Sequence, residues 1–192
     1  MAETPSTMRE LGTPAPEFVL PDPSGTLHRK SDYEGKPLLV AFICNHCPFV
    51  KHIADRFAEL TADYVDKGVG VVLINSNDVT SHPEDAPESM AEFAKERGFR
   101  VPYLYDESQE VAKAFHAACT PDFFLFDRRH TLVYRGQFDD SRPGNGKGVT
   151  GADLTAAVEA LLRGDEPPET QKPSVGCNIK WRRGNEPDFF SL

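Results

Sequence analysis

The sequence predicts a three-layer α/β/α sandwich around a central mixed sheet, with an N-terminal β-hairpin and a C-terminal extension. Two observations predict this fold class. Apolar runs of strand length alternate along the chain with segments whose apolar residues recur every three or four positions. Later in the chain, two strand-like segments follow each other with only a short polar turn between them. Strands joined through helices pair in parallel and strands joined by a short turn pair antiparallel, so the sheet should be mixed.

The first elements are expected in the N-terminal half. Residues 1–16 are predicted to be a loose, proline-rich lead-in, and residues 21–25 are a strong turn signal between two short apolar segments, which predicts a hairpin. Residues 37–43 form a continuous apolar run, typical of a strand buried on both faces. A helix should follow to about residue 67. Its apolar positions are Phe49, Val50, Ile53, Phe57, Leu60 and Tyr64.

The middle of the chain continues this alternation. Residues 69–74 predict a second buried strand. Ser81 and Glu84 have the spacing of a capping box, which predicts the start of a helix that ends near Gly98. A shorter helix is expected over residues 108–117.

The last elements are a hairpin and a helix. Residues 121–126 and 131–138 are predicted to be antiparallel strands. Thr150 and Asp153 are suited to cap a final helix, which should end at Gly164. The expected order is therefore β, α, β, α, a short α, β, β and α after the N-terminal hairpin.

Length and charge limit the classes of function. The 192 residues suit one domain, which we expect over residues 10–164, followed by a tail over 165–192 that docks on it through its apolar side chains. The net charge of −9 argues against binding to nucleic acid or an anionic membrane, because phosphates require clustered Lys and Arg. No signal peptide or membrane-spanning run is evident, so a cytoplasmic location is expected.

Cys44-Asn45-His46-Cys47 lies at the expected strand-to-helix junction and is the most informative motif. Two cysteines separated by two residues can join across one helical turn, and the exposed helix N-terminus should stabilise the first sulfur as a thiolate. In a reducing compartment such a pair indicates redox or metal chemistry. Structural zinc is disfavoured, since the chain has no second CxxC and no histidine pair at zinc spacing. We predict neither a metal nor another cofactor.

Three features carry a resemblance to a known family. They are the hairpin region with its glycines and prolines over residues 12–37, the run Cys44-Asn45-His46-Cys47-Pro48, and Thr120-Pro121 ahead of a strand. Together they resemble the thioredoxin-fold superfamily and its redoxin branch, the peroxiredoxin-like proteins of the alkyl hydroperoxide reductase and thiol-specific antioxidant type. The likeness covers about residues 10–163. The tail segment 173–181 is similar to that of a small subgroup with the same cysteine motif.

The motif and the resemblance together imply a thiol–disulfide oxidoreductase with antioxidant relatives. Cys44 is predicted to be the nucleophile and Cys47 the resolving thiol. His46 is predicted to favour the Cys44 thiolate and make the disulfide more oxidising, the alternative being a solvated side chain. The backbone of Thr120, beside a cis Pro121, is expected to pair with a substrate peptide, unless the two residues form an ordinary turn into a strand. Protein disulfides and a thioredoxin-type electron donor are the expected partners.

Two further cysteines are open to two interpretations. The resemblance places Cys119 directly beside the active site. If the tail folds back, Cys177 reaches Cys119 or the dithiol and forms a second redox pair or a resolving thiol. The alternative is that each is a small buried hydrophobic residue.

Two other functions remain possible on the sequence. One is a thiol-dependent peroxidase, although the Pro-x-x-x-Thr/Ser-x-x-Cys pattern of peroxiredoxins is replaced by residues 40–43 ahead of Cys44. The other is a copper-binding chaperone of the thioredoxin fold, whose cysteines are usually spaced by three residues. The strand before Cys44 also lacks the buried Asp that thioredoxins carry. The sequence assigns no oligomeric state.

Overall fold

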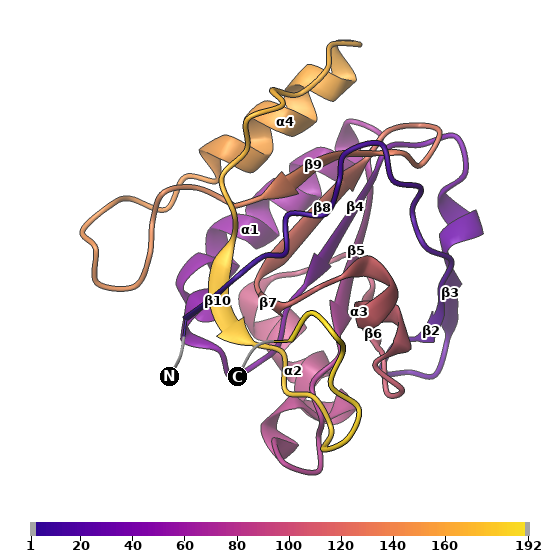
Figure 1. Ribbon diagram of the computed structural model, residues 1–192, viewed down its shortest axis with the longest axis vertical. Helices are drawn as coiled ribbons and strands as arrows, with labels where there is room; N and C mark the ends of the chain where they lie inside the picture. The colour runs from indigo at the N-terminus through magenta and orange to yellow at the C-terminus, as the bar shows by residue number, and fades with distance from the viewer. Residues whose placement is uncertain (1–2, 191–192) are drawn as a thin grey trace.

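A five-stranded mixed sheet forms the centre of the protein (Figure 1). The computed structural model describes residues 3–190, and the sheet order within them is β6-β5-β4-β8-β9. β4, β5 and β6 are mutually parallel, whereas β8 and β9 run antiparallel to their neighbours. The strands are β4 (Leu38–Phe42), β5 (Gly70–Asn75), β6 (Tyr103–Tyr105), β8 (Asp122–Phe126) and β9 (Leu132–Gly136). The predicted α/β class and its mixed sheet are confirmed.

The central strand divides its side chains between two apolar cores. Successive residues of a strand point to opposite faces, so the apolar run of β4 contributes alternately to each core. On one face lie α1 (Pro48–Asp66), α2 (Pro87–Arg97) and α4 (Ala152–Leu162), and on the other lie α3 (Glu110–Phe115) and the N-terminal hairpin. A sheet covered on both faces explains why β4 is apolar throughout and why β5 is apolar up to Asn75.

The N-terminal hairpin forms as the turn signal predicts. β2 (Val19–Pro21) pairs antiparallel with β3 (Leu27–Arg29). In the turn, the Asp22 carboxylate accepts hydrogen bonds from the backbone N–H groups of Ser24 and Thr26 at 2.9 and 3.1 Å. A short 3₁₀ helix, η1 (Lys30–Tyr33), then leads into β4.

A second, three-stranded sheet joins the two ends of the chain. β10 (Val175–Asn178) lies between β1 (Glu3–Pro5) and β7 (Cys119–Thr120) and is antiparallel to both. The prediction of a loose lead-in over residues 1–16 is therefore wrong for residues 3–5. The sequence could not show this, because the partner strand lies some 170 residues away.

Helix starts differ from the predictions in two places. α1 begins at Pro48 and not at Cys44, which leaves the cysteine motif in the loop before the helix. α2 begins at Pro87, and Glu84 belongs to a separate 3₁₀ helix, η2 (Pro83–Asp85). Proline is favoured at the first helical position because its missing N–H is unpaired there in any case, so it outweighs the capping-box pattern.

The prediction missed β6, as it missed β1, β7 and β10. β6 is only three residues long and follows Pro102, so it shows no recognisable alternation. It nevertheless completes the parallel part of the sheet by pairing with β5. Among residues 3–190, no helix has both the length and the apolar character that crossing a membrane requires.

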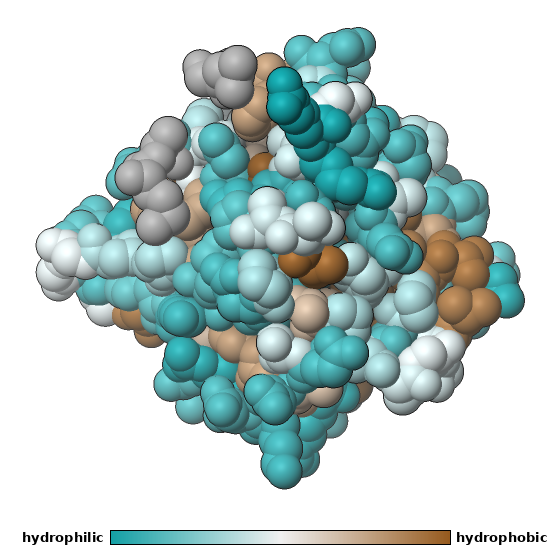
Figure 2. Space-filling model, turned by 90° about the horizontal axis from the view of Figure 1, so that it is seen from below, coloured by the Kyte–Doolittle hydropathy of each residue, from teal (hydrophilic) through white to brown (hydrophobic). Residues whose placement is uncertain are grey.

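The surface near α2 and the end of β10 is mostly hydrophilic. Figure 2 views the protein from below Figure 1, the side on which these elements lie, and shows hydrophobic residues only in separate areas between polar ones. Ile179 and Trp181 pack against the core that contains α3 and the hairpin.

Candidate active site

The cysteine motif lies where the central strand ends and the longest helix begins. Ile43 separates Cys44 from the end of β4, and Cys47 is the N-cap residue of α1 with an extended backbone, φ −67° and ψ 126°. All four cysteines belong to the described residues, are at most 1 % exposed and form no disulfide. The expectation that Cys44 meets an exposed helix terminus is therefore wrong for this state of the protein.

Thr120 contacts both sulfurs of the motif. Its Oγ1 lies 3.5 Å from Cys44 Sγ, and its carbonyl oxygen lies 3.3 Å from Cys47 Sγ. The peptide bond between Thr120 and Pro121 is cis. The loop that the resemblance assigns to substrate binding is thus directly opposite the dithiol.

The peptide-binding edge of that loop is already occupied. Thr120 is the partner of Cys177 in the antiparallel pair of β7 and β10. The sequence predicts that the Thr120 backbone is open to an incoming strand, and in the structure the protein's own tail fills this position. A peptide can pair here only after β10 has left.

The two remaining cysteines make different contacts. Cys177 Sγ lies 2.9 Å from Cys47 Sγ. Cys119 Sγ instead faces the carbonyl oxygen of Pro121 at 3.6 Å. Of the two possibilities for Cys177, the structure thus shows the contact with the dithiol and not a pair with Cys119.

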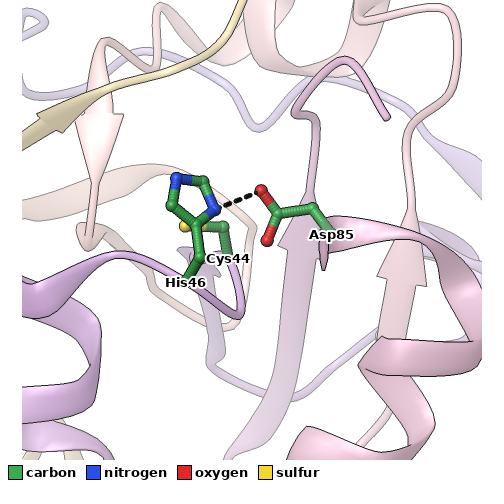
Figure 3. Close-up of side chains that lie close together, drawn as sticks. All are labelled: Cys44, His46 and Asp85. Atoms are coloured by element: carbon green, nitrogen blue, oxygen red, sulfur yellow. Dashed lines mark ion pairs between the residues drawn. The ribbon is translucent and has the colours of Figure 1, made fainter. Parts of the chain in front are cut away.

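His46 forms an ion pair with Asp85 (Figure 3). Their Nδ1 and Oδ2 atoms are 2.6 Å apart and the two side chains point toward one another, with Cys44 behind the imidazole. The Asp85 carboxylate also accepts hydrogen bonds from Asn45 N at 2.8 Å and Asn77 Nδ2 at 2.9 Å. On its other side the His46 ring stacks on His82, with ring centres 5.2 Å apart.

This pairing shifts the pKa of each partner so that its charged form is favoured. The Asp85 carboxylate raises the pKa of His46 above its usual value of 6.5. Burial by itself raises the pKa of Asp85, but His46, Asn77 and the Asn45 N–H outweigh it and the pKa is lowered. The pairing therefore favours the charged form of both His46 and Asp85 beside Cys44.

The thiols share their protons unequally. Burial raises the pKa of Cys44, and the neighbouring Cys47 and Asp85 raise it further. The thiols of Cys177 and Cys44 lower the pKa of Cys47, and the same contact raises the pKa of Cys177. Of these thiols, Cys47 is thus the one whose thiolate is favoured, and it lies at the N-cap of α1, where the unpaired N–H groups of the first helical turn also favour negative charge.

Two expectations about tuning are corrected by this arrangement. The helix terminus stabilises a thiolate at Cys47 and not at Cys44. His46 is balanced by Asp85, whose own charge opposes a thiolate at Cys44. Because Asp85 lies in η2, some 40 residues further along the chain, no local pattern around the motif could reveal it.

Sequence reasoning also missed the residues that hold the loop. Asn45 receives a hydrogen bond from Tyr103 Oη at 2.9 Å and donates one to the carbonyl oxygen of Glu84 at 3.1 Å. Together with its backbone contact to Asp85, this fixes the peptide between the cysteines. Asp85 thereby supplies, from η2, a buried carboxylate of the kind that β4 lacks.

Cys44, His46 and Asp85 could in principle hold a metal ion, since one ligand atom of each lies within 4.8 Å of the others. With metal bonds of about 2.0 Å, two tetrahedral ligand atoms lie about 3.3 Å apart. His46 Nδ1 and Asp85 Oδ2 are closer than this and are paired with one another. The arrangement of the described residues suits an ion pair better than a metal centre.

Comparison with known proteins shows the family and the fold of the chain. The model of the AhpC/TSA family matches residues 11–135, about two thirds of the chain. The chain belongs to the AhpC/TSA family. Its fold is that of thioredoxin, as the resemblance implied: a putative thiol:disulfide interchange protein DsbE of Chlorobium tepidum, 21% identical, superposes with a TM-score of 0.62 over 80% of this chain and 98% of that one.

Relatives with named activities are redox proteins. The thiol-disulfide oxidoreductase ResA of Geobacillus kaustophilus is 30% identical over 125 residues, which are 65% of this chain and 68% of ResA. A putative peroxiredoxin of Mycobacterium tuberculosis is 31% identical over 115 residues, 59% of this chain and 68% of its own. The chain is accordingly an oxidoreductase.

The likeness to some solved structures extends over nearly the whole chain. An uncharacterised conserved protein of Geobacillus kaustophilus is 53% identical, with a TM-score of 0.92 over 95% of this chain and 97% of its own. The family match ends at residue 135, whereas this likeness reaches well beyond it, so the later part of the chain has its own counterpart.

Proposed function

We propose that the chain exchanges disulfides with thiols through Cys44 and Cys47, with Cys44 as the nucleophile. The observation that carries the proposal is the double contact of Thr120, which brings the loop before Pro121 against both sulfurs. An arrangement that served packing alone would not require two coupled, buried thiols beside a paired histidine and aspartate.

The reaction follows from where the protons lie. The Cys44 thiol passes its proton to the Cys47 thiolate, and the Cys44 sulfur attacks one sulfur of the substrate disulfide. The other substrate sulfur leaves as a thiolate and takes the proton that Cys47 holds. Cys47 then attacks Cys44 Sγ, the mixed disulfide breaks, and the second substrate sulfur leaves. Two electrons have moved to the substrate, and the Cys44–Cys47 disulfide remains.

The charge favoured on Cys47 also affects the reduction potential of the Cys44–Cys47 pair. A stabilised thiolate stabilises the reduced form, which makes the disulfide a stronger oxidant. We propose protein disulfides or thiols as substrates and a thioredoxin-type protein as the electron donor, in the cytoplasm. In either direction the buried sulfurs become accessible only when the segments that cover them move.

A peroxidase function is the second candidate. The burial of Cys44 favours it, because a small hydroperoxide needs less opening than a protein does. The Cys44 thiolate would attack the peroxide O–O bond and release an alcohol or water, leaving a sulfenic acid. Cys47 would then attack that sulfur, release water and form the same Cys44–Cys47 disulfide.

The test of the proposal measures turnover and potential on the same protein. Disulfide exchange is followed with a fluorescent glutathione disulfide, and peroxide consumption is measured in parallel. We expect Cys44→Ser to lower exchange by about a hundredfold, since no other thiol substitutes for the attacking sulfur. Cys119→Ser is the matched control, because that thiol is equally buried but turned away from the dithiol, and its activity should stay near wild type.

Equilibration in glutathione buffers then places the couple on the redox scale. The charge on Cys47 leads us to expect a potential nearer about −120 mV than about −270 mV. Full exchange activity in Cys44→Ser would contradict the proposal. Copper titration covers the chaperone alternative: a thiolate charge-transfer band lost in Cys44→Ser, without exchange activity in the wild type, would favour that reading.

A further inference from the structure

The tail strand β10 lies across the active site as a peptide substrate would. It runs antiparallel to β7, with Cys177 opposite Thr120 and Asn178 opposite Cys119. In Figure 1 the arrow of β10 passes beside β7, near the lower end of the sheet. The chain thus fills the position that recognition by strand addition would give to another protein.

Several contacts hold β10 in this place. Gly176 permits the close approach, because a Cβ atom there would lie 2.0 Å from the carbonyl oxygen of Thr120. Ser174 Oγ donates a hydrogen bond to the carbonyl oxygen of Pro121 at 2.6 Å. Beyond the strand, Lys180 N donates to the buried Asn77 side chain at 2.9 Å. Because Asn77 also binds Asp85, the tail and the His46–Asp85 pair share one residue.

The register decides which side chain of β10 meets the dithiol. Residues directly opposite each other in an antiparallel pair project to the same face. Thr120 directs its hydroxyl at Cys44, so its partner Cys177 also faces the dithiol. The result is the distance of 2.9 Å between Cys177 Sγ and Cys47 Sγ. Three sulfurs are thus in sequence, with Cys47 in the middle.

We propose that Cys177 is a third redox thiol of this site and forms a disulfide with Cys47. The inference rests on the proposed function in one respect, namely that oxidation enters through Cys44. The Cys177 sulfur attacks Cys47 Sγ of the Cys44–Cys47 disulfide, and a Cys47–Cys177 bond forms as the bond to Cys44 breaks. Cys44 leaves with the electron pair and takes the proton that Cys177 gives up. No external oxidant or reductant is needed for this step.

The exchange has two consequences. Cys44 becomes a thiol again while the protein stays oxidised, so the two oxidising equivalents are stored in the bond between Cys47 and Cys177. The new disulfide ties β10 to the start of α1, which keeps the peptide-binding edge of Thr120 covered. Reduction of that bond by an external thiol is then the event that allows β10 to leave and a protein substrate to pair with Thr120.

Disulfide mapping tests the inference on the full-length protein. The reduced protein is equilibrated over a series of glutathione ratios, quenched with acid, denatured, labelled with N-ethylmaleimide and digested for mass spectrometry. We expect a Cys47–Cys177 cross-linked peptide, with Cys44 and Cys119 carrying the label. Oxidised protein in which Cys44–Cys47 is the sole disulfide and Cys177 is labelled at every ratio would overturn the inference.

Variants separate this inference from the proposed function. In Cys177→Ser, labelling of Cys44 in the oxidised protein should fall about tenfold, because nothing displaces it from Cys47. Cys119→Ser is the matched control and should give the wild-type pattern. Circular dichroism checks that each variant folds, and the time course of wild-type oxidation needs no variant: the Cys44–Cys47 peptide should appear first and decline as Cys47–Cys177 accumulates.

Each pattern of results has one meaning. If Cys44→Ser abolishes exchange and the Cys47–Cys177 link never forms, the function stands and the inference fails. If the link forms in the wild type but exchange activity survives in Cys44→Ser, the third thiol stands and the nucleophile assignment fails. A link between Cys119 and Cys177 would overturn the register argument itself.

Discussion

Cys119 and Cys177 lie on adjacent strands of one small sheet, are equally buried, and differ completely in what their sulfurs meet. Cys177 is opposite Thr120 and faces the dithiol. Cys119 is the neighbour of Thr120 on the same strand, so it points to the opposite face, toward a carbonyl oxygen. A difference of one residue in strand register therefore distinguishes a candidate redox thiol from a side chain that only packs.

The pKa shifts of these two thiols have different origins. Burial is the main cause that raises the pKa of Cys119. For Cys177 the main cause is the hydrogen bond with Cys47, and burial comes second. A raised pKa by itself therefore does not distinguish an inert thiol from a reactive one, whereas the cause of the shift does.

The largest effect on the difference between Cys119 and Cys177 is expected from Gly176→Ala. The new Cβ would lie 2.0 Å from backbone oxygen, which cannot yield as a side chain can. We expect the docking of β10 to lose about 3 kcal/mol, and alkylation of Cys177 in the native reduced protein to accelerate about 100-fold. Gly148→Ala is the control, because its Cβ would meet nothing within 4 Å. Unchanged labelling of Cys177 in Gly176→Ala would mean that β7 does not hold the strand.

A smaller effect is expected from the ion pair between His46 and Asp85, which lies beside Cys44. The raised pKa of His46 gives stability that is complete below 6.5 and disappears as the pH rises through the folded value. The lowered pKa of Asp85 gives stability that is complete above 3.8 and disappears as the pH falls through the folded value. The pair therefore contributes most between these two pH values.

Asp85→Asn should lose this contribution. We expect a loss of about 2 kcal/mol in the free energy of unfolding between pH 4 and 6.5, and a smaller loss at alkaline pH, where His46 is neutral in the wild type as well. Urea unfolding across the pH range measures it. His46→Gln should remove the same pH dependence, so a double variant that adds the two losses in full would contradict the ion pair.

The smallest predicted effect distinguishes the two faces of β7. Thr120→Val keeps the shape and the backbone contact with Cys47 but removes the hydroxyl 3.5 Å from Cys44 Sγ. That hydroxyl lowers the pKa of Cys44, so its loss should raise the pKa and slow alkylation of Cys44 about threefold. Cys119, one residue away on the other face, serves as the internal reference. A rate for Cys119 that changes as much as that for Cys44 would show that the variant disturbs the whole strand.

Much of the fold follows from local patterns in the sequence. The apolar runs predict β4 and β5, the Asp22 turn predicts the hairpin of β2 and β3, and the three- and four-residue spacing predicts α1 nearly to its last residue. These features succeed because burial on two faces, turn chemistry and helical periodicity all act within a few residues. The sequence does not predict the short β6 or the start of α2, because a distant pairing strand determines the first and a proline determines the second.

The sequence by itself determined the fold class, the family and the place of the dithiol at the end of a buried strand. Only the tertiary structure decided which sulfur holds the charge, which carboxylate pairs with His46, and which of two tail-side cysteines faces the site. The reason is range: Asp85 and Cys177 reach the motif from 40 and 130 residues away. Their contacts depend on strand register and burial, which no local pattern in the chain specifies.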